Sequence, residues 1–251
     1  MGSPEPEVML RGGNMAGPTV RIGDTVRRRA GPWTPAVHHL LRHLEQAGFH
    51  GAPRALGIDE HGREVLSFVQ GEVVHPRILD DGDLVRVAQL IRDYHLAAAS
   101  YVPPPEAEWN ADGRDPRGVD ELVCHNDLAP WNLITGDQQW AFVDWDLAAP
   151  GRRLWDLALA ACSFVPLKPD RPADIRRYAL FCEAYGLQAA DQDALLDVVV
   201  ERTTRMWQIL VEQAAHEPYA SLVREGHATF WQRVAQHVQQ LTVSQQQLSG
   251  S

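Results

Sequence analysis

The sequence predicts an α+β fold with two lobes, a small β-rich N-terminal lobe and a larger, mainly helical C-terminal lobe. Short apolar segments interrupted by glycines fill the first seventy residues, as is typical of strands joined by turns. From about residue 82 the apolar residues recur at helical spacing instead. A compact region at 121–146 again has the short apolar runs of strands, and a Pro- and Gly-rich loop at about 102–120 precedes it.

The N-terminal lobe, residues 1–70, is expected to contain a small sheet. The segments VML (8–10) and TVRI read as strands on either side of a glycine-rich loop. Gly23 and Asp24 form a turn into a third strand. A second hairpin, with the polar turn DEHG, is expected over 54–69.

One helix is expected in this lobe, over about 34–47. Thr34 is placed to cap it, Pro35 suits the first helical position, and Gly48 lies just past its end. An apolar stripe repeats at i, i+3, i+4 and i+7, formed by Val37, Leu40, Leu41 and Leu44. The stripe predicts that the helix packs on the sheet.

The C-terminal lobe, residues 71–243, is expected to be mainly helical. A first apolar stripe begins at Leu84. Four later segments read as helices as well, at 154–165, 172–185, 191–215 and 219–241. The last residues, 244–251, are polar and have no core face, so we expect a flexible tail there.

The composition is that of a globular protein of 251 residues, with 45% apolar and 22% charged residues. No apolar run approaches the roughly 20 residues that span a bilayer. The N-terminus lacks the basic start and apolar core of a signal peptide. The three cysteines, Cys124, Cys162 and Cys182, have no CxxC spacing and are expected to be buried thiols. We therefore expect a cytoplasmic protein without a membrane partner.

The formal net charge of −10 bears on the other partners. A nucleic-acid groove needs a basic footprint, so the charge argues against a nucleic-acid partner. The acidic balance suits a small-molecule substrate that is itself cationic. We expect a monomer or a weak homodimer.

A hairpin in the 121–146 region is expected to shape the functional site. The short apolar runs LIT and WAFV flank the turn sequence GDQQ. A hairpin closed there pairs Thr135 with Trp140 and Leu133 with Phe142. Residues that face each other on paired strands have Cβ atoms roughly 5 Å apart.

The open end of this hairpin brings Asn132 beside Asp144. An amide and a carboxylate are hard oxygen ligands, which suit Mg²⁺ completed by phosphate and water. Asp127 lies five residues before Asn132, on the loop that enters the hairpin. A carboxylate there can accept the proton of a hydroxyl nucleophile as it meets a metal-bound phosphate. These three residues predict phosphoryl transfer to a small-molecule hydroxyl.

Two segments, HNDLAPWN (125–132) and FVDWD (142–146), together resemble the aminoglycoside phosphotransferase and choline kinase family, relatives of the protein kinases. The family motif is His-x-Asp with an Asn five residues after the Asp, and then an Asp on the next strand. The order of the lobes agrees along roughly residues 8–240. The resemblance implies a two-lobed protein-kinase-like fold and a small-molecule kinase that uses Mg²⁺ and ATP.

The resemblance assigns roles to individual residues. Asp127 matches the catalytic Asp of the family, and Asn132 and Asp144 match its metal ligands. His125 matches the motif histidine, which is chiefly structural in that family. Asp156 resembles the downstream Asp that braces the catalytic loop.

The resemblance also places the nucleotide site in residues 1–70, and the catalytic and substrate sites in residues 71–243. The residues expected to contact the nucleotide are Gly12, Gly13 and Asn14 of the GGNMAG loop and Ser67, Phe68 and Val69 of the hinge. The hinge residues would meet the base through their backbone.

The phosphate-pairing Lys that the family carries on its third strand is missing. Arginines occupy this strand, and Arg27 is the favoured substitute, with Arg28 close behind. Strand alternation sends the two side chains to opposite faces, so only one can enter the site. The arginines can also form a solvated strand face. The first helix has no Glu in its first half to pair with this residue; Glu45 lies late. The choice between ATP and GTP therefore stays open.

Two functions compete with the kinase. The missing Lys and Glu favour a nucleotide-binding pseudokinase without turnover. A metal-dependent hydrolase is the second alternative, because His125 and Asp127 are residue types that also bind Zn²⁺. Asp146 can join the metal, contact a cationic substrate or be structural. Among acceptors, aminoglycosides or related antibiotics lead, ahead of choline-like amino alcohols, homoserine-like metabolites and sugars.

Overall fold

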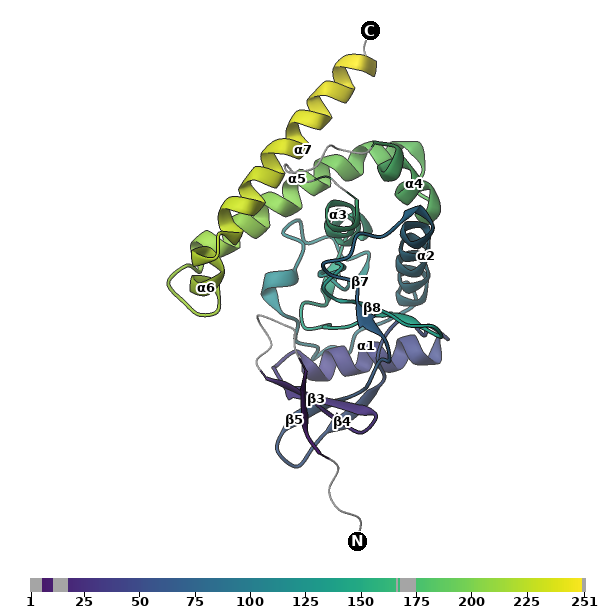
Figure 1. Ribbon diagram of the computed structural model, residues 1–251, viewed down its shortest axis with the longest axis vertical. Helices are drawn as coiled ribbons and strands as arrows, with labels where there is room; N and C mark the ends of the chain where they lie inside the picture. The colour runs from purple at the N-terminus through teal and green to yellow at the C-terminus, as the bar shows by residue number, and fades with distance from the viewer. Residues whose placement is uncertain (1–5, 11–17, 166, 168–174, 250–251) are drawn as a thin grey trace. The chain divides into compact units, whose positions relative to one another are not determined.

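The computed structural model describes residues 6–10, 18–165, 167 and 175–249. The chain divides into two compact units. The first consists of Met1–Arg77 and Asp93–Pro150, and the second of Ile78–Arg92 and Gly151–Ser251. The N-terminal part is rich in sheet and the C-terminal part is helical, which confirms the predicted α+β fold class (Figure 1).

The first unit is built on a five-stranded antiparallel sheet with the order β1-β2-β3-β5-β4. Its strands are β1 (Val8–Leu10), β2 (Thr19–Ile22), β3 (Thr25–Arg29), β4 (Ala55–Ile58) and β5 (Arg63–Ser67). Gly23, in the turn between β2 and β3, has a φ of 55°, a left-handed conformation that glycine adopts without strain. Both predicted hairpins are confirmed.

Helix α1 (Thr34–Gln46) lies beside this sheet (Figure 1). Its predicted apolar stripe is buried: Val37, Leu40, Leu41 and Leu44 are each at most 1% exposed. The helix begins at Thr34, as expected, but Trp33 and not Thr34 is in the capping position. The Thr34 hydroxyl instead accepts a hydrogen bond from the backbone N–H of Gly31, at 2.9 Å.

A smaller sheet contains the predicted hairpin of β8 (Leu133–Thr135) and β9 (Trp140–Phe142). The register pairs Leu133 with Phe142 and Thr135 with Trp140, as the sequence predicts. The short strand β6 (Glu72–Val73) adds to the outer edge of β8, and no sequence pattern indicated it. Strands β7 (Leu122–Cys124) and β10 (Ala149–Gly151) form a separate two-stranded sheet. In the chain, β7 precedes the hairpin and β10 follows it.

The second unit is helical. Its helices are α3 (Arg153–Phe164), α4 (Ile175–Tyr185), α5 (Ala189–Glu212), α6 (Tyr219–Arg224) and α7 (His227–Ser249), together with the first turns of α2 (Asp81–Ala98). Helix α7 packs along α5 (Figure 1), and α5 packs on α3. Most side chains of α3 are buried, including Trp155 and Asp156, each 0% exposed.

The end of the chain differs from the sequence prediction. One helix was expected over 219–241, but Gly226, with a φ of 88°, separates α6 from α7. Helix α7 then continues to Ser249, through residues that were expected to form a polar tail. Among the described residues, no helix is long and apolar enough to cross a membrane. The three cysteines are buried thiols, as predicted.

Candidate functional site

The loop between β7 and β8 carries the predicted motif and is organised by His125. The backbone N–H of Asp127 donates to Nδ1 of His125 at 3.2 Å. The ring therefore carries its proton on Nε2, which donates to the carbonyl of Val143 at 3.2 Å. With Nδ1 engaged by the loop and Nε2 by the carbonyl of Val143, directly after β9, His125 supports the backbone and offers no lone pair to a metal, which argues against the hydrolase alternative.

Asp127 is held from two sides at its carboxylate. Its Oδ2 accepts a hydrogen bond from Nδ2 of Asn132, at 2.6 Å, and another from Nε1 of Trp131, at 3.3 Å. Nδ2 of Asn132 also donates to the backbone carbonyl of Asp127, at 3.0 Å. The amide nitrogen of Asn132 thus donates its hydrogen bonds to Asp127, and its amide oxygen is the atom suited to a cation.

Asp144 follows directly after the hairpin. The backbone N–H of Val143 donates to the carbonyl of Asn132 at 2.9 Å, so the hairpin pairing continues to the residue before Asp144, as predicted. The φ of Asp144 is 62°, in the left-handed region that few residues other than glycine adopt. Such strain costs on the order of 1–3 kcal/mol and is found mainly at functional sites, where the surrounding structure enforces it.

Trp145 fixes the segment that carries Asp144 and Asp146. Its side chain is 1% exposed, with its ring 4.4 Å from that of His125 and 5.0 Å from that of Tyr94, measured between centroids. Its indole N–H donates to the carbonyl of Phe142 at 2.9 Å. The two carboxylates on either side of Trp145 are therefore anchored through the core.

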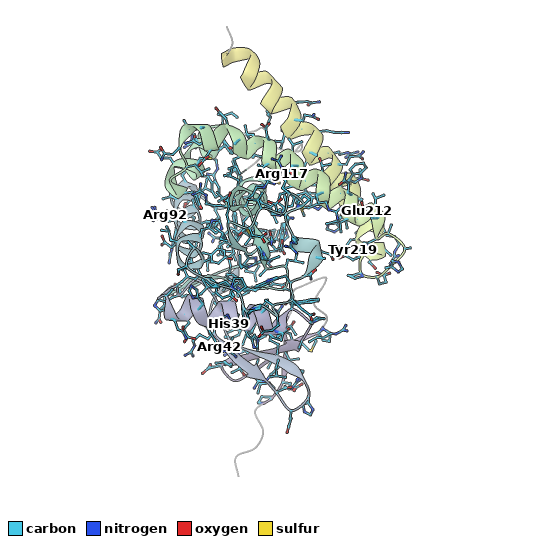
Figure 2. All side chains as sticks on the ribbon, turned by 180° about the vertical axis from the view of Figure 1, so that it is seen from behind. His39, Arg42, Arg92, Arg117, Glu212 and Tyr219 are labelled. Atoms are coloured by element: carbon cyan, nitrogen blue, oxygen red, sulfur yellow. The ribbon has the colours of Figure 1, made fainter. Side chains whose placement is uncertain are left out.

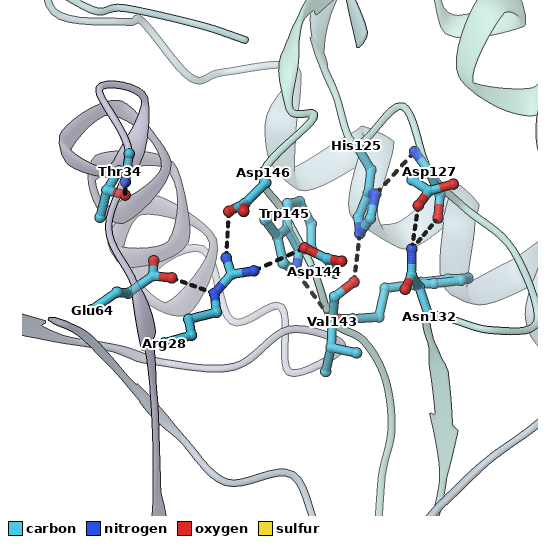
Figure 3. A network of polar contacts seen from close by, with 12 residues as sticks. Arg28, Thr34, Glu64, His125, Asp127, Asn132, Val143, Asp144, Trp145 and Asp146 are labelled. Atoms are coloured by element: carbon cyan, nitrogen blue, oxygen red, sulfur yellow. Dashed lines mark hydrogen bonds and ion pairs between the residues drawn. The ribbon is translucent and has the colours of Figure 1, made fainter. Parts of the chain in front are cut away.

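Arg28 of β3 is the arginine that lies beside these carboxylates (Figure 3). Its Nε contacts Glu64 at 2.5 Å, Nη1 contacts Asp144 at 2.8 Å, and Nη2 contacts Asp146 at 2.5 Å. The side chain is only 6% exposed. Burial alone would lower the pKa of Arg28, but the charges of the three carboxylates outweigh it and raise the pKa above its ordinary value.

Arg27 points to the opposite face of the sheet, as strand alternation requires. Its guanidinium lies 3.7 Å from the carboxylate of Asp59 and donates to the hydroxyl of Thr25. The sequence favoured Arg27 over Arg28 as the substitute for the missing Lys. In the structure it is Arg28 that reaches Asp144.

Glu64 on β5 is the residue that sequence reasoning missed. It sits directly across from Arg28 in the register of β3 and β5 and is 1% exposed. His38 of α1 contacts its other carboxylate oxygen at 3.0 Å. Burial favours the neutral acid, but the hydrogen bond from His38 and the charge of Arg28 prevail and lower the pKa of Glu64. Only the long-range strand register reveals this partner.

Asp146 is the third carboxylate beside Arg28. Burial raises its pKa to about 6, and the negative charges of Asp144 and Glu64 act in the same direction. The charge of Arg28 opposes this rise. Among the described residues, no group of three or more His, Cys, Asp and Glu side chains is arranged to hold a metal ion. A cation here would therefore depend on the amide of Asn132 in addition to carboxylates.

The other predicted nucleotide contacts are the residues of the GGNMAG loop and of the hinge. Gly12, Gly13 and Asn14 lie outside the described residues. In the hinge, the backbone N–H of Phe68 donates to the carbonyl of Asp24 at 2.8 Å. The backbone N–H and carbonyl of Arg54 bind the Ser67 side chain and backbone, and Val69 is buried. Phe68 N–H therefore serves the fold, and the hinge contact with a base stays a prediction.

The two adjacent histidines of α1 behave differently from each other. His38 is buried against Glu64. His39 is exposed on α1, where Figure 2 labels it together with Arg42. Its Nδ1 lies 3.0 Å from the hydroxyl of Tyr101, whose pKa burial raises to about 12.

Comparisons with known proteins found a family model and a curated relative that match this chain. The model of the phosphotransferase enzyme family (APH) matches residues 86–197. A curated relative, the trifolitoxin immunity protein of Rhizobium leguminosarum bv. trifolii, is 33% identical over 208 residues, which cover 77% of this chain and 79% of the relative.

Solved structures of low sequence identity share the fold. An amicoumacin kinase in complex with AMP-PNP, Ca²⁺ and Ami has a TM-score of 0.66 at 12% identity, covering 92% of this chain and 88% of its own. A choline kinase from Cryptosporidium parvum has a TM-score of 0.66 at 11% identity, covering 98% and 91%.

Proposed function

The chain belongs to the phosphotransferase enzyme family and is a small-molecule kinase with an alcohol group as acceptor, and we propose that its donor is ATP with Mg²⁺ and its acceptor an antibiotic. The arrangement of Asp127, Asn132 and Asp144 at one end of the β8–β9 hairpin is the observation that carries the donor half of this proposal. GTP is proposed as the alternative donor.

Asp127 is proposed as the group that orients the acceptor hydroxyl. The hydrogen bonds from Asn132 and Trp131 fix the plane of its carboxylate. A carboxylate held in this way accepts a hydrogen bond from an incoming hydroxyl and aims its oxygen at the γ-phosphorus. It takes the proton as the new O–P bond forms and the bond from that phosphorus to the departing nucleoside diphosphate breaks. Fixing the geometry in advance removes an entropic part of the barrier.

Asn132 and Asp144 are proposed as the metal ligands. Their oxygens are hard donors, and the amide of Asn132 is turned so that its N–H groups face Asp127. The chemistry of this donor set fits Mg²⁺, which also takes phosphate oxygens and water as ligands. When bound, Mg²⁺ neutralises charge on the transferring phosphoryl group.

Arg28 is proposed as the phosphate contact. A guanidinium has five N–H groups, and the three contacts with Glu64, Asp144 and Asp146 use three of them. The remaining N–H groups lie on the Nη edge, which faces the carboxylates. Arginine suits phosphate because its planar fork binds two oxygens at once.

The acceptor is proposed from the relatives. The curated relative is named for immunity to trifolitoxin, and one solved structure of the same fold is an amicoumacin kinase. Aminoglycoside-like antibiotics are the leading class, and amino alcohols such as choline come second, because a choline kinase shares the fold. The net charge of −10 supports a cationic acceptor.

A nucleotide-binding module without turnover is the second candidate. It is favoured by the contacts of Arg28 with Asp144 and Asp146, which tie the proposed phosphate contact to the proposed metal ligand. We also propose that residues 1–70 serve the nucleotide and residues 71–243 the acceptor. The site of action is proposed to be the cytoplasm, consistent with three buried thiols.

The test is an acceptor panel. Purified protein is incubated with ATP or GTP, with and without Mg²⁺, and with amino-sugar antibiotics, macrolides, amicoumacin, trifolitoxin and choline-like alcohols. ADP or GDP release that requires both an acceptor and Mg²⁺ supports the proposal, and the Asp127→Asn variant serves as the blank. Nucleotide binding without acceptor-dependent release across the panel favours the module without turnover.

A further inference from the structure

The contact between Glu64 and Arg28 differs from those that Arg28 makes with the aspartates. Glu64 holds Nε, the nitrogen nearest the side-chain stem, while Asp144 and Asp146 contact the two terminal nitrogens. A planar group held at Nε has its terminal edge fixed in direction. Both partners are almost fully buried, at 5% and 1% exposure, so water does not compete for this contact.

We propose that Glu64 is a positioning residue, which aims the terminal edge of Arg28 at the nucleotide phosphates beside Asp144. This inference rests on the proposed function. Glu64 acts through Arg28 and touches neither nucleotide nor acceptor.

The orientation of Arg28 is set by the sheet. Arg28 and Glu64 are direct partners in the antiparallel register of β3 and β5, so main-chain hydrogen bonds on both strands hold them together. Helix α1 joins this pair through His38, which contacts the second oxygen of Glu64 at 3.0 Å. The helix therefore supports the carboxylate and does not itself supply it.

The direction in which nucleotide binding changes when Glu64 is removed tests this proposal. Glu64, Asp144 and Asp146 place three carboxylates around one guanidinium. If Glu64 acted only through its charge, its removal would make the site less negative and strengthen binding of an anionic nucleotide. If it positions Arg28, its removal weakens binding instead, because Arg28 is left to the aspartates alone.

The experiment measures binding of AMP-PNP with Mg²⁺ by calorimetry, together with KM for ATP and kcat. Glu64→Gln keeps the side-chain shape and removes the charge. We expect the Kd for AMP-PNP and the KM for ATP to rise about 10- to 100-fold, the range for a hydrogen bond to a charged group. Glu72→Gln is the matched control, since Glu72 is exposed on β6 and loses the same charge.

A double-mutant cycle separates positioning from a general structural effect. In the Arg28→Ala background, Glu64→Gln should raise the Kd no further, because the residue it positions is gone. If Glu64→Gln does not fold, Glu64→Asp replaces it, since the shorter carboxylate keeps the charge but displaces the contact. The same direction of change is expected.

Three results overturn the inference. One is unchanged or tighter AMP-PNP binding by the Glu64 variants, and another is a loss matched by Glu72→Gln. The third is an additive loss in the Arg28→Ala background. Wild-type protein that binds no AMP-PNP refutes the proposed function itself, which distinguishes the two failures.

Discussion

Trp131 donates its indole N–H to Oδ2 of Asp127, the same carboxylate oxygen that accepts the amide of Asn132. Two donors on one oxygen fix the direction of the carboxylate. Trp131→Phe keeps an aromatic ring and removes the N–H. We expect kcat to fall roughly 2- to 10-fold, because this contact with the carboxylate is long, at 3.3 Å, with little change in KM for ATP. Steady-state kinetics measure this, with Trp109→Phe as a control in the preceding loop. An unchanged kcat removes the indole from the site.

Asp127→Asn should lower kcat on the order of 10²- to 10⁴-fold, the usual loss for a general base. The amide can still accept hydrogen bonds from Trp131 and Asn132, so folding and AMP-PNP binding should persist. Single-turnover assays with the acceptor identified in the panel provide the measurement. Turnover at the wild-type rate would show that another group orients the hydroxyl.

Arg28→Ala and Arg27→Ala should have clearly different effects on nucleotide binding. Removing Arg28 is expected to weaken nucleotide binding by roughly 1.5–3 kcal/mol. Removing Arg27 breaks only its contacts with Asp59 and Thr25 on the other face and should leave binding within about 2-fold. Calorimetry with Mg²⁺ present is the measurement. Equal losses in both variants would contradict the assignment of faces.

Asp144→Asn tests the metal ligand without disturbing the backbone. Asn tolerates the left-handed conformation that Asp144 adopts, with its φ of 62°, whereas most residues do not. We expect the Mg²⁺ concentration needed for half-maximal activity to rise at least about 10-fold, in line with a lost metal contact. Circular dichroism checks the fold. A Mg²⁺ dependence identical to that of the wild type would argue against ligation by Asp144.

The stabilising effect of Glu64 should depend on pH. The pKa of Glu64 is lower in the folded protein than its ordinary value of 4.5, so its charge stabilises the fold above that pH. This stability is lost as the pH falls through the folded pKa. At pH 7 we expect Glu64→Gln to cost about 1–3 kcal/mol of unfolding free energy. The difference from wild type should shrink below about pH 4.5 in chemical denaturation, and a constant difference would contradict it.

The sequence predicts the β8–β9 register because both strands and their turn lie within ten residues of each other. Turn chemistry and alternation then leave a single pairing. Glu64 could not be found in the same way, since it lies 36 positions from Arg28 and depends on how β3 meets β5. Likewise, alternation shows that Arg27 and Arg28 diverge, but which one faces Asp144 depends on where the segment after β9 lies.

The anchoring of Trp145 limits how the site can be regulated. If the segment 144–146 turned over, the indole of Trp145, which is 1% exposed, would leave the core. Loss of a buried aromatic side chain from a core costs roughly 3–5 kcal/mol. At that cost, the conformation with this segment turned over would be populated by less than about one molecule in a hundred. The two carboxylates are therefore constitutively assembled. We therefore expect that the enzyme has no inactive conformation of this site that needs activation, and that its rate follows the concentration of its acceptor.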